Sequence, residues 1–330
     1  MKPCVFCGGL RGELALQTVY EDREVVAFLD HRPLFPGHVL LIPRRHVEQL
    51  DALRVSEMTP LFERLRVLVR SVPRALQAQG AFVANNNKVS QSVPHLHFHV
   101  VPRSKGDGLK GFFWPRVPYR DEAHAEEVRL RIEECTWQES ILDFWIGPLD
   151  ESGWVPPEQA RQWFAQDAEF DRQIALRFGS LVERALLGQL ASWEQEPRGA
   201  LALLILLDQF TRNLFRHTGR AFAGDERAQQ LAWKLRQQGL DRQLALPERI
   251  FTYLPFEHGE SHEWQQRSLE AFQELAGAKK KKKKKFLDYA ERHARVIERF
   301  GRYPHRNQAL GRTSTPEEEA FLSQPGSSFW

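Results

Sequence analysis

The chain has 330 residues, of which 42% are hydrophobic and 27% are charged, and its formal net charge is +3. This balance is typical of a soluble globular protein, the length predicts two domains, and so small a net charge does not by itself indicate nucleic-acid binding. The longest wholly apolar run, residues 200–207, is far shorter than the roughly 20 residues of a membrane span, so we expect no membrane partner. The lack of a signal-peptide pattern and the use of only three cysteines predict a cytoplasmic protein.

The first motif in the chain is a pair of cysteines, Cys4 and Cys7, in a C-x-x-C spacing. Two thiolates at this spacing can share a tetrahedral metal ion, and His46 and His95 are the candidates for the two further ligands. Taken alone, the pair is also compatible with a redox function or with coincidence. We expect Cys135, which has no partner motif, to be a buried thiol.

Up to about residue 120 the chain alternates short β-rich segments with proline and glycine turns. The β-rich segments include residues 25–29, 39–42 and 96–101, and one helical stretch follows Ser56. This pattern indicates an α+β domain. A glycine-rich and then aromatic segment, residues 105–116, follows; its aromatic side chains can cover a base or a dimer partner, or simply pack.

Three histidines, His95, His97 and His99, occupy every second position of the last β-rich segment. In a β-strand, this period of two places the three imidazoles on one face and the intervening apolar residues on the other. Ordinary packing on a half-buried strand is the alternative, but three histidines in register favour a reactive surface. A neutral imidazole can attack phosphorus while a charged neighbour donates a proton to an oxygen. Residues 90–94 supply hydroxyl and amide donors that can hold a phosphate.

The run of residues 95–101 resembles the signature of the histidine-triad (HIT) family of nucleotide hydrolases and transferases. Residues 36–46 are similar to that family's strand before its first long helix, and residues 85–94 are similar to its substrate loop. The similarity covers about residues 1–118. It implies an antiparallel sheet with helices, a nucleotide substrate and a homodimer formed through this domain.

The resemblance also implies roles for the histidines. His97 would be the nucleophile that takes up a nucleoside monophosphate, and His99 would contact the phosphate and help to protonate the leaving group. His99 stands where the transferase branch carries Gln, which favours hydrolysis. A subset of the family binds zinc in the pattern that this chain reproduces, so the resemblance implies a structural zinc ion held by Cys4, Cys7, His46 and His95.

The same resemblance implies contacts to the substrate. Asp30 would hold the ribose hydroxyls, and Gln91 and Ser92 would contact phosphate. The loop before them is rich in asparagine where some members are richer in glycine, so several side chains are candidates for the phosphate or the leaving group: Asn85, Asn86 and Asn87.

From Ile141 onward the spacing of apolar residues follows helical periods and strand signals are absent. Four stretches resemble a bacterial family of unknown function whose fold is all-α and similar to tetratricopeptide-repeat arrays: residues 141–145, 207–213, 255–260 and 299–307. We therefore expect a HIT-like domain over residues 1–137 and an all-helical domain over residues 138–330.

The matching stretches are rich in groups that bind anions. Asp208 and Arg212 lie four residues apart on a predicted helix and can pair, and guanidinium groups suit bidentate phosphate contacts. A buried structural network that links the helices is the alternative. The candidate site of this domain comprises Asp208, Arg212, Asn213, His258, Glu260, Arg302, His305 and Arg306.

Seven consecutive lysines, Lys279 to Lys285, predict an extended, solvated loop, because like charges in a block repel one another. Electrostatic attraction of RNA or a polyphosphate to this run is the alternative. No aromatic residue is interleaved within the run for base stacking.

Together these features predict a hydrolase of a nucleoside 5′-phosphate linkage that works through a nucleotidyl-His97 intermediate. The substrate would be a phosphoramidate, an adenylated amine or a dinucleoside polyphosphate, and the helical domain would bind a phosphate-bearing ligand or RNA. One alternative is a nucleotide-sensing or RNA-binding adaptor without turnover, whose helical array recruits a partner. Another is a bifunctional enzyme with a second active site in the helical domain.

Overall fold

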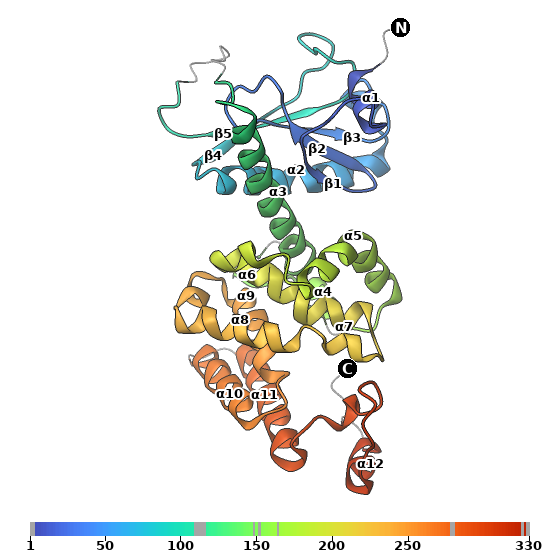
Figure 1. Ribbon diagram of the computed structural model, residues 1–330, viewed down its shortest axis with the longest axis vertical. Coiled ribbons are helices and arrows are strands. Elements are labelled where there is room, and N and C mark those ends of the chain that lie inside the picture. The colour runs from blue at the N-terminus through green and yellow to red at the C-terminus, as the bar shows by residue number, and fades with distance from the viewer. Residues whose placement is uncertain are drawn as a thin grey trace. The chain divides into compact units, whose positions relative to one another are not determined.

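The computed structural model describes residues 4–108, 117–147, 149–150, 153–163, 165–277, 281–324 and 327. The chain divides into two compact units, Met1–Ser140 and Ile141–Trp330, called here the first and the second unit (Figure 1). The aromatic side chains of the predicted extension, Phe112, Phe113 and Trp114, lie outside the described residues. Among the described helices, none combines the length and the apolar character needed to cross a bilayer.

The first unit is built on a five-stranded antiparallel sheet in the order β1-β2-β3-β5-β4. Its strands are β1 (Thr18–Glu21), β2 (Val25–Leu29), β3 (Val39–Pro43), β4 (Gly80–Ala84) and β5 (Phe98–Arg103). Its helices are α1 (Val5–Leu10), α2 (Val55–Ala75) and α3 (Glu122–Trp145), of which α3 ends in the second unit, and a short 3-10 turn covers Leu50–Ala52. The predicted α+β class with an antiparallel sheet and helices is confirmed.

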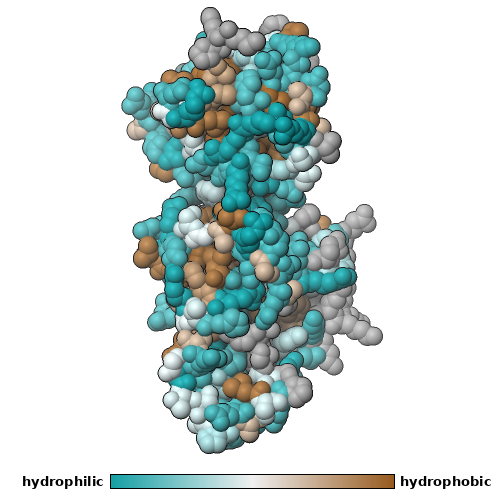
Figure 2. Space-filling model, turned by 90° about the vertical axis from the view of Figure 1, so that its right-hand side faces the viewer, coloured by the Kyte–Doolittle hydropathy of each residue, from teal (hydrophilic) through white to brown (hydrophobic). Residues whose placement is uncertain are grey.

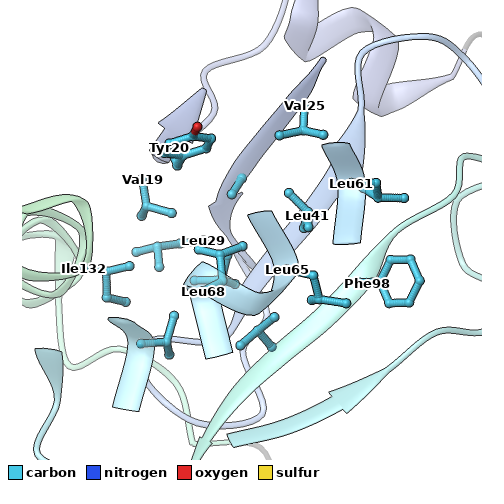
Figure 3. Close-up of a cluster of buried hydrophobic side chains, with 14 of the residues drawn as sticks. Val19, Tyr20, Val25, Leu29, Leu41, Leu61, Leu65, Leu68, Phe98 and Ile132 are labelled. Atoms are coloured by element: carbon cyan, nitrogen blue, oxygen red, sulfur yellow. The ribbon is translucent and has the colours of Figure 1, made fainter. Parts of the chain in front are cut away.

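Each face of the central strands is covered by its own apolar cluster, so that β2 and β3 are buried throughout. On one face, a stripe of leucines from α2 packs against the strands (Figure 3): Leu61, Leu65 and Leu68 against Val25, Leu29, Leu41 and Phe98. On the other face, Phe28, Leu40 and Ile42 pack against Phe6 of α1. His99 pairs with Leu40 across β3 and β5, so its side chain lies on this second face.

The second unit is helical, and its described residues contain no strand, as predicted. Its helices are α4 (Pro157–Gln162), α5 (Ala168–Leu186), α6 (Pro197–Leu204), α7 (Thr211–Leu214), α8 (Asp225–Gln237), α9 (Leu246–Glu257), α10 (His262–Ala276), α11 (Lys281–Phe300) and α12 (Pro316–Leu322). A π-helical turn, η3 (Ile205–Phe210), joins α6 to α7, and 3-10 turns cover Ala191–Gln195, Gly219–Phe222, Leu240–Gln243 and Pro304–Arg306. Helices α8 to α11 pack as successive neighbours. The likeness to tetratricopeptide arrays stays a prediction.

The core of the second unit is strongly aromatic. Phe210 stacks on Phe178 with ring centroids 5.3 Å apart and meets Trp145 edge-on at 5.5 Å, and all three side chains are fully buried. Residues 200–211 are buried on every side, which is typical of a helix at the centre of a domain. On the face shown in Figure 2, hydrophilic side chains predominate and hydrophobic ones occur in small patches.

The prediction of a loop over the lysine run is wrong for Lys281 to Lys285, because α11 begins at Lys281. Lysine is a good helix former, and repulsion between like charges on a helix costs only a few tenths of a kcal/mol per pair. The buried side chains of Ala290, Val296 and Ile297 anchor the rest of α11, so the helix extends back into the lysines. Lys279 and Lys280 lie outside the described residues.

Candidate functional site

The spacing predicted that the three alternating histidines lie on one strand. In the structure only His99 lies on β5. Strand β5 starts at Phe98, so His95 and His97 lie in the segment before it, where the Leu96 N–H donates to the Val47 carbonyl outside the sheet. The alternation nevertheless persists, because Leu96 and Phe98 are buried in the cluster against α2. The imidazole rings gather on the opposite side around Phe6, whose ring lies 5.9 Å from that of His95 and 5.5 Å from that of His97.

The tautomer of His97 is set by the backbone. Its Nδ1 lies 2.7 Å from the carbonyl oxygen of His95, and a carbonyl can only accept, so Nδ1 carries the proton and Nε2 keeps the lone pair. Burial lowers the pKa of His97, which favours this neutral form. The ring is 2% exposed and lies between Phe6 and His99, so a substrate can reach Nε2 only when a covering side chain moves.

A fourth histidine, His38, belongs to the same site, although its position in the sequence predicted no role for it. The Leu34 N–H donates to His38 Nδ1 at 3.2 Å, so the proton of His38 is on Nε2, which donates to His99 Nδ1 at 2.9 Å. This chain of hydrogen bonds leaves the proton of His99 on its own Nε2. Its position could have indicated this role, because His38 lies two residues before Leu40, the residue that pairs with His99 across β3 and β5.

The backbone before His38 requires glycine. Gly37 adopts a left-handed φ of +88°, and a Cβ at this position would meet Leu76 Cδ1 at 2.1 Å. The tight turn therefore sets the direction in which His38 enters β3. The stretch of residues 36–46, which resembles the family's strand, thus contains both this turn and strand β3.

The sequence predicted a charged histidine as the proton donor, whereas His99 is neutral in the free protein. Burial lowers the pKa of His99 to about 4, so the ring is neutral at neutral pH in the free protein. Asp30, predicted to hold the ribose, has Oδ2 at 3.4 Å from His38 Nδ1 and accepts the Arg32 N–H on Oδ1 at 2.8 Å. Ligand atoms of Asp30, His38 and His99 all lie within 4.8 Å of one another, a closeness that the hydrogen bond between the two rings accounts for.

The loop that resembles a substrate loop is held by its own amide side chains. Asn85 donates to the His97 carbonyl at 2.7 Å and accepts from Asn87 at 2.6 Å, so it is tied directly to the triad segment. Asn86 makes a weaker contact to the Ser90 carbonyl at 3.4 Å. Gln91 donates to the Glu48 carbonyl at 2.6 Å, which secures the loop, and Ser92 is exposed.

The four predicted metal ligands converge. His95 Nδ1 lies 3.5 Å from Cys4 Sγ and 3.6 Å from Cys7 Sγ, and His46 Nδ1 lies 3.3 Å from Cys7 Sγ. A tetrahedral zinc ion with Zn–S of about 2.3 Å and Zn–N of about 2.0 Å holds such atoms roughly 3.5 Å apart. His95 Nε2–H donates to the Pro43 carbonyl at 2.9 Å, which leaves Nδ1 for the metal. The donor set therefore fits zinc. Cys135, expected to be buried, is partly buried against the core.

In the second unit, Asp208, Arg212 and His258 form one cluster. The predicted pairing is confirmed, because Arg212 Nη1 lies 3.2 Å from Asp208 Oδ1. His258 Nδ1 lies 2.6 Å from the same oxygen, so Nδ1 donates and Nε2 keeps the lone pair of the neutral ring. Although burial opposes it, Arg212 and His258 hold the pKa of Asp208 low, at about 2. Asp208 lies on the π-helical turn η3, a feature often found at functional sites.

A cavity of about 320 Å³ lies beside this cluster. Five of the predicted residues line it: Arg212, Asn213, His258, His305 and Arg306. Asp208 is not among the lining residues but contacts Arg212 and His258. Glu260 and Arg302 are not among its lining residues; Glu260 accepts from Arg312, and Arg302 donates to Glu318.

Several lining residues were not predicted. His293 Nδ1 lies 3.1 Å from Glu257 Oε1, and Arg216 and Tyr289 also line the cavity. Burial raises the pKa of Glu257 to about 8, so its carboxyl is protonated at neutral pH. Glu257 lies in the matched stretch before His258, which was the available signal. Nothing in the spacing connects it to α11.

Comparisons with known proteins match the two units to two different families. A model of the HIT domain matches residues 11–106, and a model of a bacterial protein of unknown function (DUF924) matches residues 141–326. The chain is 38% identical over 107 residues to an uncharacterized HIT-like protein of Methanocaldococcus jannaschii, which covers 32% of this chain and 82% of that protein.

Two relatives from Schizosaccharomyces pombe carry named activities. An adenosine 5′-monophosphoramidase is 30% identical over 135 residues, covering 39% of this chain and 98% of that protein. An asymmetrical bis(5′-nucleosyl)-tetraphosphatase is 37% identical over 93 residues, covering 28% of this chain and 51% of that protein.

Among solved structures, a protein of unknown function from Agrobacterium tumefaciens is 37% identical, covers 56% of this chain and 96% of its own, and has a TM-score of 0.49. A zinc-bound histidine triad family protein from Mycobacterium smegmatis is 30% identical, covers 42% and 96%, and has a TM-score of 0.37. From the family models and the relatives' sequences, the chain belongs to the histidine-triad (HIT) family through its first unit and to the bacterial family of unknown function DUF924 through its second.

Proposed function

We propose that the first unit is a hydrolase that cleaves a nucleoside 5′-phosphate linkage through a covalent nucleotidyl-His97 intermediate. The observation that carries this proposal is the hydrogen bond from His97 Nδ1–H to the His95 carbonyl, because it leaves the Nε2 lone pair as the reactive position. The named activities of the two yeast relatives support phosphoramidates, adenylated amines and dinucleoside polyphosphates as the substrate class.

In the first step, His97 Nε2 attacks phosphorus, the new P–N bond forms and the bond to the leaving group breaks. The His97 ring becomes cationic, and its Nδ1–H bond to the His95 carbonyl stabilises that charge. An anionic phosphoryl group beside His99 favours the charged form of that ring, so we expect substrate to bind together with one proton. The charged His99 ring carries a proton on both nitrogens, so its Nδ1–H then donates to His38 Nε2, and the proton of His38 shifts to its Nδ1 beside Asp30 Oδ2. The leaving group departs with the proton of His99 Nε2, which leaves the His99 ring neutral.

In the second step, water attacks the same phosphorus. The P–O bond forms, the P–N bond breaks, and the electron pair returns to His97 Nε2, while His99 takes up the proton of the water. Asp30 lies beside His38 and Asn85 beside His97, so ribose and phosphate contacts from these two side chains fit the position of the reacting histidines.

We also propose that Cys4, Cys7, His46 and His95 hold a structural zinc ion. The zinc would supply no chemistry at phosphorus; it would fix α1 against the triad segment. Phe6 lies between Cys4 and Cys7 and packs edge-on against His97, so a fixed α1 holds the phenyl ring over the nucleophile.

The test is turnover of adenosine 5′-phosphoramidate and of diadenosine tetraphosphate by the full chain. His97→Ala should lower kcat by at least about 10³-fold, since the nucleophile is lost. His124→Ala, a histidine of α3 outside the triad site, should leave kcat unchanged. Tight nucleotide binding by the wild-type chain without product release would refute the hydrolase and support the adaptor.

A further inference from the structure

Arg306, which lines the cavity of the second unit, is a buried guanidinium with one open edge. Its side chain is 7% exposed, and the ring centroids of Phe222 and Tyr303 each lie 4.6 Å from its Cζ, which fixes its position. Its Nη1 donates to Asp225 at 3.2 Å, whereas Nε and Nη2 donate to no described residue. Nη2, unlike Nε, is not fully buried, so this edge can be reached from the cavity.

The edge formed by Nε and Nη2 is the one that holds carboxylates elsewhere in this chain. Arg216 donates from these two atoms to the two oxygens of Asp171, and Arg302 donates from the same two atoms to Glu318. Two parallel N–H groups match the spacing of the two oxygens of one carboxylate. The open edge of Arg306 therefore has the form of a carboxylate site.

Two carboxylates near Arg306 are already engaged with other donors. Glu260, whose charge acts on Arg306, accepts from both Nη atoms of Arg312. Asp225 also lies 2.9 Å from Arg212 Nη1. Burial lowers the pKa of Arg306, because a charged group loses solvation there, and an open N–H edge adds to this cost. Buried polar groups are nearly always satisfied, so we expect a molecule from outside the chain to occupy this edge.

His258 contributes an open acceptor to the same cavity. Its Nδ1–H donates to Asp208 at 2.6 Å, so Nε2 carries the lone pair, and Nε2 makes no hydrogen bond within the described part of the chain. The side chain is 16% exposed and lines the cavity. Burial lowers the pKa of His258, which favours the neutral ring. A neutral acceptor that borders a small cavity fits a hydroxyl group of a bound molecule.

Arg306 and His258 lie on different segments but close to the same residue. His258 directly follows α9, whereas Arg306 follows α11. The ring centroid of His258 lies 6.5 Å from that of His293. Burial lowers the pKa of His293 well below its usual value, and the nearby His258 and Arg306 lower it further. The two open groups therefore border one space, within reach of one small molecule.

We propose that this cavity binds a small hydroxycarboxylate. Its carboxylate accepts from Arg306 Nε–H and Nη2–H, and its hydroxyl group donates to His258 Nε2. One guanidinium edge binds one planar carboxylate, and one lone pair accepts from one hydroxyl group. A volume of about 320 Å³ suits a small molecule and not a nucleic-acid chain. The proposal does not depend on the chemistry of the triad.

The test is isothermal titration calorimetry of the full chain with benzoate and with 2-, 3- and 4-hydroxybenzoate. The three isomers vary the distance between carboxylate and hydroxyl group, so the probes do not presuppose that distance. We expect benzoate to bind, at least one isomer to bind about threefold tighter or more through the added hydrogen bond, and neutral benzamide not to bind. Absence of binding by all the carboxylates, equal binding of benzamide, or no gain from any hydroxyl group would overturn the proposal. Tighter binding of phenyl phosphate than of the best isomer would also overturn it.

Two variants assign the two contacts. Arg306→Lys keeps the positive charge but loses the paired N–H groups, so the Kd of every carboxylate should rise at least about tenfold. Arg302→Lys is the matched control, because Glu318 fills that edge of Arg302 and Arg302 does not line the cavity, so its Kd should match that of the wild type. His258→Asn keeps a donor for Asp208 but removes Nε2, so the gain from the hydroxyl group should vanish while benzoate binds as before.

A thermal melt of each variant verifies that it is folded. If Arg306→Lys does not fold, the gain from the hydroxyl group in the wild type and its loss in His258→Asn still decide the outcome. Equal Kd values for Arg306→Lys and Arg302→Lys would overturn the proposal. A gain from the hydroxyl group that persists in His258→Asn would overturn it as well.

Discussion

Replacing His38 tests whether the hydrogen-bonded row of imidazoles sets the proton of His99. In the native site the Leu34 N–H forces the His38 proton onto Nε2, which donates to His99 Nδ1 at 2.9 Å. His38→Phe keeps a ring of similar size but removes this donor. His99 is then free to adopt the other tautomer, which presents a lone pair to the leaving group instead of a proton.

The expected loss follows from one hydrogen bond. A net contribution of about 0.5–1.5 kcal/mol converts into a fall in kcat of about twofold to tenfold. This is far less than the loss from His97→Ala, because the nucleophile and the proton donor both remain. His38 is 2% exposed and the Leu34 N–H loses its acceptor, so His38→Phe should also lower the free energy of unfolding by about 1–3 kcal/mol.

The assay compares two leaving groups at equal nucleotide. An amine needs a proton as it departs, whereas p-nitrophenolate does not, so His38→Phe should slow hydrolysis of adenosine 5′-phosphoramidate and leave the p-nitrophenyl ester of AMP nearly unchanged. His38→Gln, whose amide can donate to His99, should recover part of the rate on the phosphoramidate. The same loss on both substrates, or no loss on either, would refute the assigned role of His38.

Three further predictions concern metal, pH and backbone. Cys4→Ser should lower bound zinc, measured by elemental mass spectrometry, from about one per chain to near zero, while Cys135→Ser should not; equal zinc in both would exclude the proposed site. Burial raises the pKa of Glu257 to about 8, so between the usual pKa of a glutamate and about pH 8 the folded chain binds more protons than the unfolded chain. The urea midpoint should therefore fall as the pH rises through that window. The fall should be smaller in Glu257→Gln, and an equal fall in both proteins would contradict the burial argument. Gly224→Ala should lower the free energy of unfolding by at least about 1–3 kcal/mol, because the added Cβ would lie 2.2 Å from the Leu207 carbonyl oxygen. Gly179→Ala in α5 is the control, since its Cβ meets open space and the change should be neutral or stabilising. Equal effects of the two changes on the urea midpoint would argue against the clash.

The sequence was a good guide wherever a local pattern expresses a single physical cause. The period of two around His97 predicted which side chains share a face, because alternation depends only on extended backbone. The spacing of Cys4 and Cys7 predicted that their thiols lie close together, and both lie near His95 Nδ1. Asp208 and Arg212 were predicted to pair because they lie one helical turn apart.

What the sequence did not predict depends on contacts between distant segments. Strand β5 starts only at Phe98, because the Leu96 N–H donates a hydrogen bond to the Val47 carbonyl and not to a neighbouring strand, and no local pattern encodes this contact. The role of His38 depends on the register between β3 and β5. In the second unit, Glu257 acquires its raised pKa from burial beside α11, and the first lysines of α11 are helical because the helix packs farther along.

The most direct test of the central claim is capture of the covalent intermediate. The full chain is mixed with adenosine 5′-phosphoramidate, quenched within milliseconds, digested and analysed by mass spectrometry. The account predicts an adenylyl group on the peptide that contains His97, bonded to Nε2, and no such adduct with His97→Ala. Turnover without an adduct, or an adduct on a different residue, would contradict it.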